Sequence, residues 1–517
     1  MRHALDKRRL AGIALCVVAV VVGFVLGEGY IDRLPRHAGY FLVSVEDEVR
    51  VPIPARPRHT AFVVVDGLRR DFAESMRVTK ELARAGQCRV SDQGSFTVSR
   101  PEYALLSTGL EVDRTGSRNN DLTAPLAAES IWQIARRSGL RVSGSSHLRW
   151  FEQLFPDGFD RFSHQKSHAA DVFAPENGEL LDVNVFHPLY VDENAHQHGA
   201  RSPEYAAAVA RVDGEIAGLL ARLDLSQDLV VLTADHGHRD AGGHGGAQPE
   251  IRNVLVCFAG RGVAARADVG AFDGRSTAPA LAVLLGLRFP RNMRAGDDGL
   301  DVLWDIALPT AERAGYLADR HAAVDRFREE NRVALERWLG GAPGTWPRLY
   351  EREARAQTWR FGSVAVFALV CAALSFRARR LGSHAALETT AWLAFSALTV
   401  WCVHHAVLGD FEFTVINLRE RFIPRAAAVA IVSALATLVA HARIVRDPTR
   451  LAGDLLLSIG LLLTMNVGHV YVYGWPFGFP LPSQAARYFP FFGAIALVTY
   501  ALAALLLLVI QWRRART

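Results

Sequence analysis

The sequence predicts an α/β protein whose sheet is sandwiched between helices, together with a membrane-spanning part. Between residues 32 and 309, short apolar runs typical of strands alternate with stretches of helical periodicity. Such alternation is typical of a sheet that is covered by helices on both faces. Apolar segments near the N-terminus and after residue 359 are long enough to cross a lipid bilayer, which takes about 20 residues.

Strands and helices are expected in turn along the region 32–309. The strand candidates are residues 61–65, 140–144, 186–191, 229–234 and 252–258. The helix candidates are residues 73–85, 127–137, 203–222 and 277–285. The charged stretch 310–358 has helical spacing of its apolar residues and is expected to be a helical connector that leads back to the membrane.

The membrane-spanning part is expected to consist of a retained anchor at residues 11–31 and about five spans within 359–512. The apolar segments of this second part run near 360–376, 385–408, 424–441, 451–472 and 489–511. Alternating basic loops place residues 1–10 and the tail 513–517 in the cytoplasm and region 32–309 outside it. The many Arg and few Lys residues favour a bacterium, and therefore a multi-pass protein of the inner membrane with that region in the periplasm or outside the cell.

Charge and cysteine content restrict the class only weakly. The net charge of +5 is small for 517 residues, and no basic tract interleaved with aromatic residues indicates binding of nucleic acid. Nothing in the sequence indicates an oligomeric state. Cys88 and Cys257, the two cysteines of the polar region, could form a disulfide, but two buried thiols are favoured because unpaired Cys is commonly buried.

Seven side chains suited to metal and phosphate chemistry lie at or just after predicted strands. Two apolar runs end in Asp66 and in Asp235-His236, and each is followed by glycine. The complete set is Asp66, Thr97, Asp192, His196, Asp235, His236 and His244. Catalytic groups of open α/β sheets gather at the carboxyl ends of the strands. We therefore expect a site for two divalent metal ions about 3.5–4 Å apart, which would clamp the attacking and leaving oxygens of an in-line displacement.

The nucleophile of this expected site is Thr97, whose hydroxyl needs activation by a metal ion. The ion beside it would be held by Asp66, Asp235 and His236. The second ion would be held by Asp192, His196 and His244. Mixed carboxylate and imidazole ligands suit zinc best, with manganese or iron possible. Each motif alone has a plainer interpretation as a turn or a surface histidine, but their joint occurrence in this order favours the functional interpretation.

With these motifs the chain resembles the alkaline phosphatase superfamily, in its phosphodiesterase and phosphotransferase branch, over roughly residues 60–300. The segment Thr97–Pro101 is most similar to that of GPI ethanolamine phosphate transferases. The resemblance implies an alkaline-phosphatase-like fold and a covalent phospho-intermediate on Thr97. It also implies that Asn120 or Asn119 donates a hydrogen bond to a phosphate oxygen. The chain departs from that family in having Glu102-Tyr103 where Gly-His usually follows Arg-Pro, and in a smaller membrane bundle. The sulfatase branch is disfavoured because its Cys/Ser-x-Pro-x-Arg pattern is absent.

The function expected from this resemblance is phosphotransfer at a membrane. A phosphoethanolamine-type group would move from a phospholipid donor to a lipid-linked or glycan acceptor. The alternatives are a phosphodiesterase that hydrolyses a phospholipid or nucleotide-like phosphodiester, and a membrane assembly protein with a vestigial domain. Some polar residues remain open to two interpretations. His198 and His238 line the pocket or lie in exposed loops, Asp240 lies near the metals, and His404, His405, Asn466 and His469 line a substrate groove or sit at the membrane interface.

Overall fold

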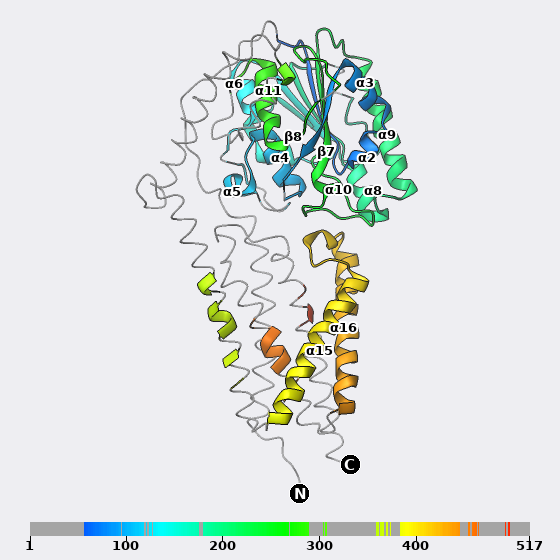
Figure 1. Cartoon of the computed structure of the whole chain (residues 1–517). Coiled ribbons are helices and arrows are strands. Elements are labelled where there is room, and N and C mark those ends of the chain that lie inside the picture. Colours follow the sequence, from blue (N-terminus) through cyan, green and yellow to red (C-terminus); the bar gives the residue numbers. More distant parts are fainter. Residues whose placement is uncertain are drawn as a thin grey trace, which may run out of the picture. The chain divides into compact units, whose positions relative to one another are not determined.

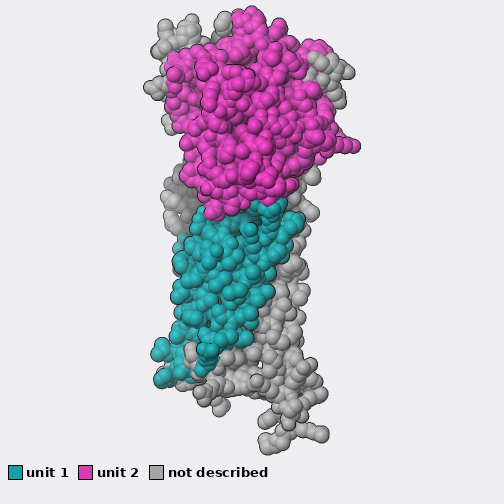
Figure 2. All heavy atoms as spheres, turned by 90° about the vertical axis from the view of Figure 1, so that its right-hand side faces the viewer, with its two compact units in different colours: residues 1–34, 348–517 teal, residues 35–347 magenta. Residues whose placement is uncertain are grey.

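The computed structural model describes mainly residues 56–288 and 383–444, with short gaps, and isolated residues between 303 and 496. The chain divides into two compact units, one of residues 35–347 and the other of residues 1–34 with 348–517 (Figure 2). The expected anchor 11–31, nearly all of the connector 310–358 and the expected tail 513–517 lie outside the described residues.

A mixed sheet forms the framework of the unit 35–347 (Figure 1). The described strands are β1 (Thr60–Val64), β2 (Gly86–Asp92), β3 (Val142–Ser146), β4 (Arg161–His164), β5 (Val183–His187), β6 (Leu229–Thr233), β7 (Asn253–Gly260) and β8 (Phe272–Asp273). Their order is β4-β3-β5-β1-β6-β7-β2-β8. β1 pairs in parallel with β5 and β6, whereas β7 runs antiparallel to β6 and β2. The predicted α/β class is confirmed.

Helices cover both faces of this sheet, which explains why every residue of β1 after Thr60 is apolar. Phe62 and Val64 pack on one side with α4 (Ser99–Thr108), α6 (Ile131–Arg137) and α11 (Thr277–Leu285). Ala61 and Val63 pack on the other side with α3 (Arg77–Ala85), α8 (Tyr190–His198) and α9 (Pro203–Leu220). Figure 1 shows the two helical layers on either side of the strands. Full burial of each larger apolar side chain contributes about 1.5–3 kcal/mol, so both layers hold the central strands in place.

Several predicted boundaries are wrong. The strand expected at 186–191 ends at His187, and α8 begins at Tyr190. The helix expected at 73–85 is two helices, α2 (Arg70–Ala73) and α3, because the Asp213 carboxylate accepts the first backbone N–H groups of α3 and starts a new helix there. The helix expected at 127–137 begins only after Ser130, whose side chain forms a capping box with Gln133. The described part of this unit also contains the short helices α5 (Val112–Thr115), α7 (Trp150–Leu154) and α10 (Pro249–Arg252).

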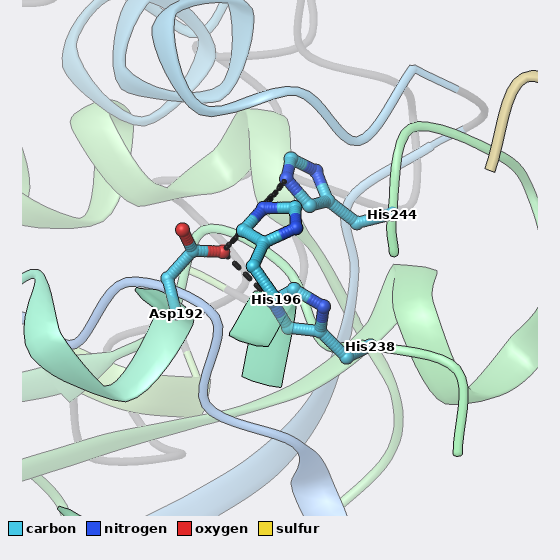
Figure 3. A group of neighbouring side chains, drawn as sticks. All are labelled: Asp192, His196, His238 and His244. Atoms are coloured by element: carbon cyan, nitrogen blue, oxygen red, sulfur yellow. Dashed lines mark hydrogen bonds and ion pairs between the residues drawn. The ribbon is translucent and has the colours of Figure 1, made fainter. Parts of the chain in front are cut away.

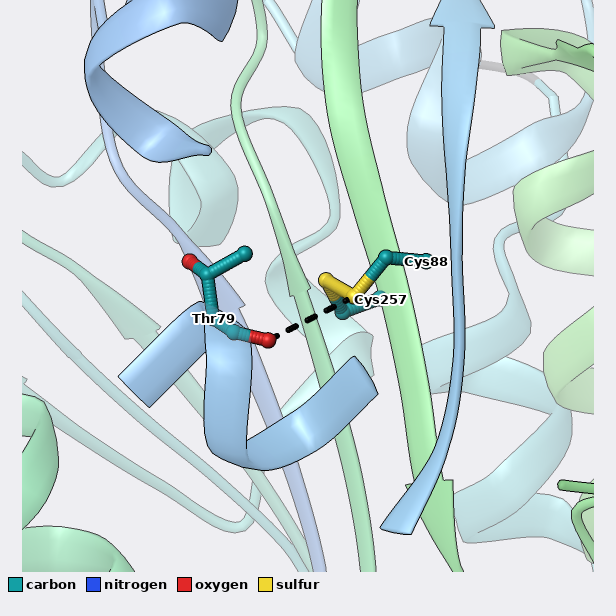
Figure 4. The surroundings of a disulfide bond; sticks show 3 residues. All are labelled: Thr79, Cys88 and Cys257. Atoms are coloured by element: carbon teal, nitrogen blue, oxygen red, sulfur yellow. Dashed lines mark hydrogen bonds between the residues drawn. A yellow bond between two sulfur atoms is a disulfide. The ribbon is translucent and has the colours of Figure 1, made fainter. Parts of the chain in front are cut away.

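Cys88 and Cys257 form a disulfide (Figure 4). The preference for two buried thiols is therefore wrong. The two residues are 169 positions apart in the chain but directly opposite each other on the antiparallel strands β2 and β7, with 4.0 Å between their Cα atoms. The strand register thus brings the two sulfur atoms together.

Two long helices represent the second unit among the described residues, α15 (Ser383–Val407) and α16 (Arg419–Ile444). Within them, His384–Val407 and Glu420–His441 are long and apolar enough to cross a membrane. They coincide with two of the five expected spans, and the number of spans stays a prediction. His404 is buried, stacks on Phe411 at 3.7 Å between ring centroids, and lies 3.0 Å through Nδ1 from the Gly409 carbonyl oxygen. These contacts favour a structural role for His404 at the end of α15.

Candidate metal and phosphate site

The site lies where three neighbouring parallel strands end. Asp66 follows β1, Asp235 and His236 follow β6, and the chain after β5 enters α8 at Tyr190. Asp192 was expected directly after a strand, but it lies in the first turn of α8, the helix that follows β5. His196 is four residues further on, on the same face of the helix. Adjacent parallel strands thus deliver all these side chains to one edge of the sheet.

Asp66, Asp235 and His236 form the first ligand group, and all three are fully buried. His236 Nε2 lies 3.6 Å from Asp66 Oδ1 and 3.3 Å from Asp235 Oδ2. Neither carboxylate oxygen has a hydrogen-bond partner among the described residues. His236 Nδ1 lies 3.2 Å from the Gly237 carbonyl oxygen, which can only accept, so the lone pair is on Nε2. Three electron-pair donors therefore face one another.

Asp192, His196, His238 and His244 form the second ligand group (Figure 3). His196 Nε2 and His244 Nε2 are 3.1 Å apart, and they lie 3.4 and 3.8 Å from Asp192 Oδ1. The three residues expected to bind the second ion are therefore together. His238, which the sequence left undecided, is buried in the same group. Asp192 also lies within 4.8 Å of the ligand atoms of Asp66 and His236, so the two groups adjoin.

Electrostatics at the site favour bound cations. Burial raises the pKa of Asp235 well above its ordinary value, and the negative charges of Asp66 and Asp192 raise it further. Burial alone would also raise the pKa of Asp192, but the surrounding imidazoles hold it below its ordinary value. Burial lowers the pKa of His236 and His244, which favours the neutral ring that can offer a lone pair. Crowded carboxylates, unpaired oxygens and neutral imidazoles fit divalent metal ions.

The hydroxyl groups of Thr97 and Ser99, in the segment Thr97–Pro101, face different partners. Thr97 Oγ1 donates to the Gly246 carbonyl oxygen at 2.7 Å and accepts the Gly245 N–H at 3.1 Å. Ser99 Oγ lies 3.3 Å from His236 Nε2, at the first residue of α4. The structure therefore places the Ser99 hydroxyl against the first ligand group. The Thr97 hydroxyl is hydrogen-bonded to the backbone of the glycine-rich loop that contains Gly245 and Gly246, which we call the glycine loop.

The two residues expected to donate a hydrogen bond to phosphate follow α5 in the sequence. Asn120 Oδ1 accepts the backbone N–H of Arg100 at 3.0 Å, one residue after Ser99. An amide whose oxygen is engaged in this way still carries two N–H donors on its nitrogen. Asn120 thus lies beside the start of α4, whereas Asn119 lies outside the described residues.

Tyr103 and His187 belong to the site but were not found from the sequence. The Tyr103 hydroxyl hydrogen-bonds Asp66 Oδ2 and lies 2.7 Å from His187 Nε2, which is itself 3.1 Å from the same Asp66 oxygen. Ser146 Oγ contacts the other nitrogen of His187 at 2.8 Å. One oxygen of Asp66 is thus held by these side chains while the other faces the ligand group. The only signal was the departure at Tyr103 from the Gly-His of the similar family.

Asp240, expected near the metals, contacts two arginines beside the site. Its Oδ1 accepts from Arg69 at 2.6 Å and from Arg201 at 3.0 Å. Arg69 also donates to the His238 carbonyl oxygen at 3.0 Å, which ties together the loops after β1 and β6. Of the other undecided histidines, His198 is exposed near the end of α8.

Residues 141–246 match the family model described as type I phosphodiesterase / nucleotide pyrophosphatase. Curated relatives include the catalytic subunit of GPI ethanolamine phosphate transferase 3 of Mus musculus, which is 25% identical over 276 residues that cover 46% of this chain and 25% of the relative. GPI ethanolamine phosphate transferase 2 of Aspergillus fumigatus is 29% identical over 274 residues, 45% of this chain and 35% of the relative. The predicted resemblance is confirmed. The chain spans between a quarter and about a third of the length of these two relatives.

The resemblance to GPI ethanolamine phosphate transferases and to the phosphodiesterase family also confirms the expectation of an enzyme, at the level of class. Solved structures similar to the chain include murine ectonucleotide pyrophosphatase / phosphodiesterase 5, with a TM-score of 0.40, 13% identity, and coverage of 48% of this chain and 100% of that one. The alkaline phosphatase PafA has a TM-score of 0.40, 11% identity, and coverage of 50% and 99%.

Proposed function

We propose that the chain is a membrane-bound, metal-dependent phosphotransferase that moves a phosphoethanolamine-type group from a phospholipid to a lipid-linked or glycan acceptor. The observation that carries this proposal is that two adjoining groups of carboxylates and imidazoles, one buried and one partly buried, lie beside a hydroxyl at the start of α4. The likeness to GPI ethanolamine phosphate transferases supports the transferred group and the acceptor class. The phosphodiesterase family match supports the alternative, in which water takes the place of the acceptor.

Two divalent metal ions, with zinc as the best match, belong to this proposal. Asp66, Asp235 and His236 would hold one ion, and Asp192, His196 and His244 the other. When bound, the ions supply the positive charge that neutralises phosphate oxygens and favours the ionised form of a hydroxyl nucleophile.

The Ser99 hydroxyl is the nucleophile that the contacts favour, with Thr97 as the alternative from the sequence. Ser99 Oγ lies against His236, and as the first residue of the ten-residue helix α4 it faces the helix end where anions are stabilised. Thr97 Oγ1 donates its proton to Gly246 and would have to break that bond to attack. Both residues are buried, so exposure does not distinguish them.

The transfer proceeds in two displacements. In the first, the nucleophile oxygen forms a bond to the donor's phosphorus, the bond from phosphorus to the lipid oxygen breaks, and the released diacylglycerol takes a proton. In the second, the acceptor hydroxyl loses its proton as its oxygen bonds the same phosphorus, the bond from phosphorus to the enzyme oxygen breaks, and that oxygen takes up a proton to regenerate the hydroxyl. Asn120, beside the start of α4, would donate its amide N–H groups to a phosphate oxygen.

The location proposed for the catalytic unit is outside the cytoplasm. The two apolar helices in the second unit support a membrane setting. The Cys88–Cys257 disulfide supports an oxidising compartment, because disulfides persist there and are rare in the cytosol. A bacterial inner membrane with the catalytic unit in the periplasm is the specific form of this proposal.

The test is peptide mass spectrometry of the full chain after incubation with zinc and membranes that contain phosphatidylethanolamine, quenched in acid. We expect a phosphoethanolamine increment on Ser99 in the wild type and in Thr97→Ala, and none in Ser99→Ala. The reverse pattern would assign the intermediate to Thr97. A labelled head group that reaches a lipid acceptor supports transfer, whereas its release to water, without transfer, from a protein that still cleaves a generic phosphodiester would establish the hydrolase alternative.

A further inference from the structure

We propose that His238 is a positioning residue that fixes the Asp192 carboxylate by hydrogen bonding and is not itself a metal ligand. This inference rests on the two-metal site of the proposed function. His238 lies in the second ligand group with Asp192, His196 and His244. Each of these four side chains places a nitrogen or oxygen within 4.8 Å of the others (Figure 3). Proximity alone would make it a fourth ligand, and four protein ligands close a zinc site to substrate.

The hydrogen bonds of the His238 ring fix which of its nitrogens carries the proton. The backbone N–H of Gly243 donates to His238 Nδ1 at 3.1 Å, so this nitrogen uses its lone pair as an acceptor. In a neutral imidazole the proton is then on Nε2, which lies 2.7 Å from Asp192 Oδ1 and donates to it. A protonated ring nitrogen has no lone pair to offer a cation. Both nitrogens of His238 are therefore committed to the protein.

His244 has the opposite arrangement. Its Nδ1 lies 2.8 Å from the Thr97 carbonyl oxygen, which can only accept, so Nδ1 carries the proton and the lone pair is on Nε2. That Nε2 faces His196 Nε2 at 3.1 Å. The backbone groups that contact these two histidines of the same loop therefore give them different roles. His244 can act as a ligand, whereas His238 acts as a hydrogen-bond donor.

The chain holds His238 in this position through backbone features on either side. Gly242 and Gly243 have φ of 85° and 97°, which lets the loop fold back so that the Gly243 N–H reaches the ring. Arg69 binds the His238 carbonyl oxygen. A side chain at Gly67 would lie 2.9 Å from His238 Nε2, so only glycine leaves room for the contact with Asp192.

Loss of this hydrogen bond should weaken one metal site without abolishing it. Residues that orient a metal ligand by hydrogen bonding to it typically contribute about 10–100-fold to metal affinity. His238→Leu removes the donor, whereas His238→Gln keeps an N–H donor of similar reach. His198→Leu is the matched control, because His198 is exposed near the end of α8.

The experiment titrates the full-length protein in detergent with zinc alone, against a chelating dye. We expect two zinc ions in the wild type, a roughly 10–100-fold weaker affinity for one ion in His238→Leu, near-normal affinity in His238→Gln, and no change in His198→Leu. The cobalt(II) spectrum of His238→Gln should equal that of the wild type, because the ligands stay the same. Melting temperatures of the zinc-free variants identify any that fail to fold, and His238→Gln then carries the comparison with the wild type.

Three results would overturn the proposal. An altered cobalt spectrum and equal loss of affinity in the Leu and Gln variants would make His238 a ligand. Wild-type affinity in a folded His238→Leu would leave it without a role, and a wild-type protein that binds no zinc would remove the site. A wild type that binds two zinc ions yet transfers no phosphoethanolamine refutes the proposed function alone, and the zinc affinities of the variants still decide the role of His238.

Discussion

Breaking the Cys88–Cys257 disulfide is expected to destabilise the unit that contains the sheet. The bond joins residues that are 169 positions apart. For a loop of this length, the loop-entropy relation gives about 17 cal/mol/K, or about 5 kcal/mol at 25 °C, removed from the unfolded chain. In a unit of a few hundred residues each kcal/mol shifts the melting temperature by about 2–4 °C, so loss of the bond should lower it by about 10–20 °C.

The assay compares thermal melting of the full chain with and without a reductant, in a Cys402→Ser background that removes the free, exposed cysteine of α15. Peptide mapping under non-reducing conditions verifies the linkage first. The double variant Cys88→Ala/Cys257→Ala should melt at a lower temperature and no longer respond to the reductant. Two free thiols in protein from an oxidising compartment, or equal melting temperatures in both conditions, would refute the reasoning and with it the support for an extracytoplasmic unit.

Two further predictions concern single side chains. Gly67 and Gly94 have φ of 70° and 83°, so alanine at either position should lower the free energy of unfolding by about 1–2 kcal/mol. The two sites differ in their surroundings, because a Cβ at Gly67 would lie 2.7 Å from the Asp192 Cα, whereas a Cβ at Gly94 would meet no atom within 4 Å. Gly67→Ala should therefore lower zinc affinity and stability beyond Gly94→Ala, and equal melting curves and zinc titrations would contradict this. Asp228 is fully buried and accepts from the half-exposed Arg58 at 2.7 Å, so Asp228→Asn should cost about 1–2 kcal/mol in urea unfolding. Burial alone would raise the pKa of Asp228, but Arg58 and backbone N–H groups hold it below its ordinary value, so this stability is present above about pH 4 and lost as the pH falls further. An unchanged acid dependence in the variant would count against it.

Elements with a simple apolar pattern could be predicted from the sequence. The runs that became β1 and β6 are buried at every residue and apolar except at Thr60 and Thr233, because helices cover both faces of the sheet. The helix α4 was not expected, because all ten of its residues are buried, among them Ser99, Arg100 and Glu102. A helix that is buried on every side and carries polar residues has no apolar stripe, so its periodicity gives no signal.

The candidate site shows the same division. Each of the six residues expected as ligands lies in a short motif that the sequence makes visible, and the structure places them in two adjoining groups, although their role as ligands stays a prediction. Tyr103 and His187 act on Asp66 across 37 and 121 positions of the chain. No local pattern records such contacts, and the role of His238 depends equally on a backbone N–H that meets its ring only after the glycine loop folds back.

The sequence by itself determined the α/β class, the donor set of carboxylates and imidazoles, and the apolar helices, because periodicity and short motifs are local properties of the chain. Only the tertiary structure decided which hydroxyl faces the ligands, which histidine nitrogen carries a proton, and that Cys88 pairs with Cys257. The physical reason is that these outcomes depend on a few ångströms between atoms from distant segments. Strand register and backbone hydrogen bonds set those distances, and they exist only once the sheet has formed.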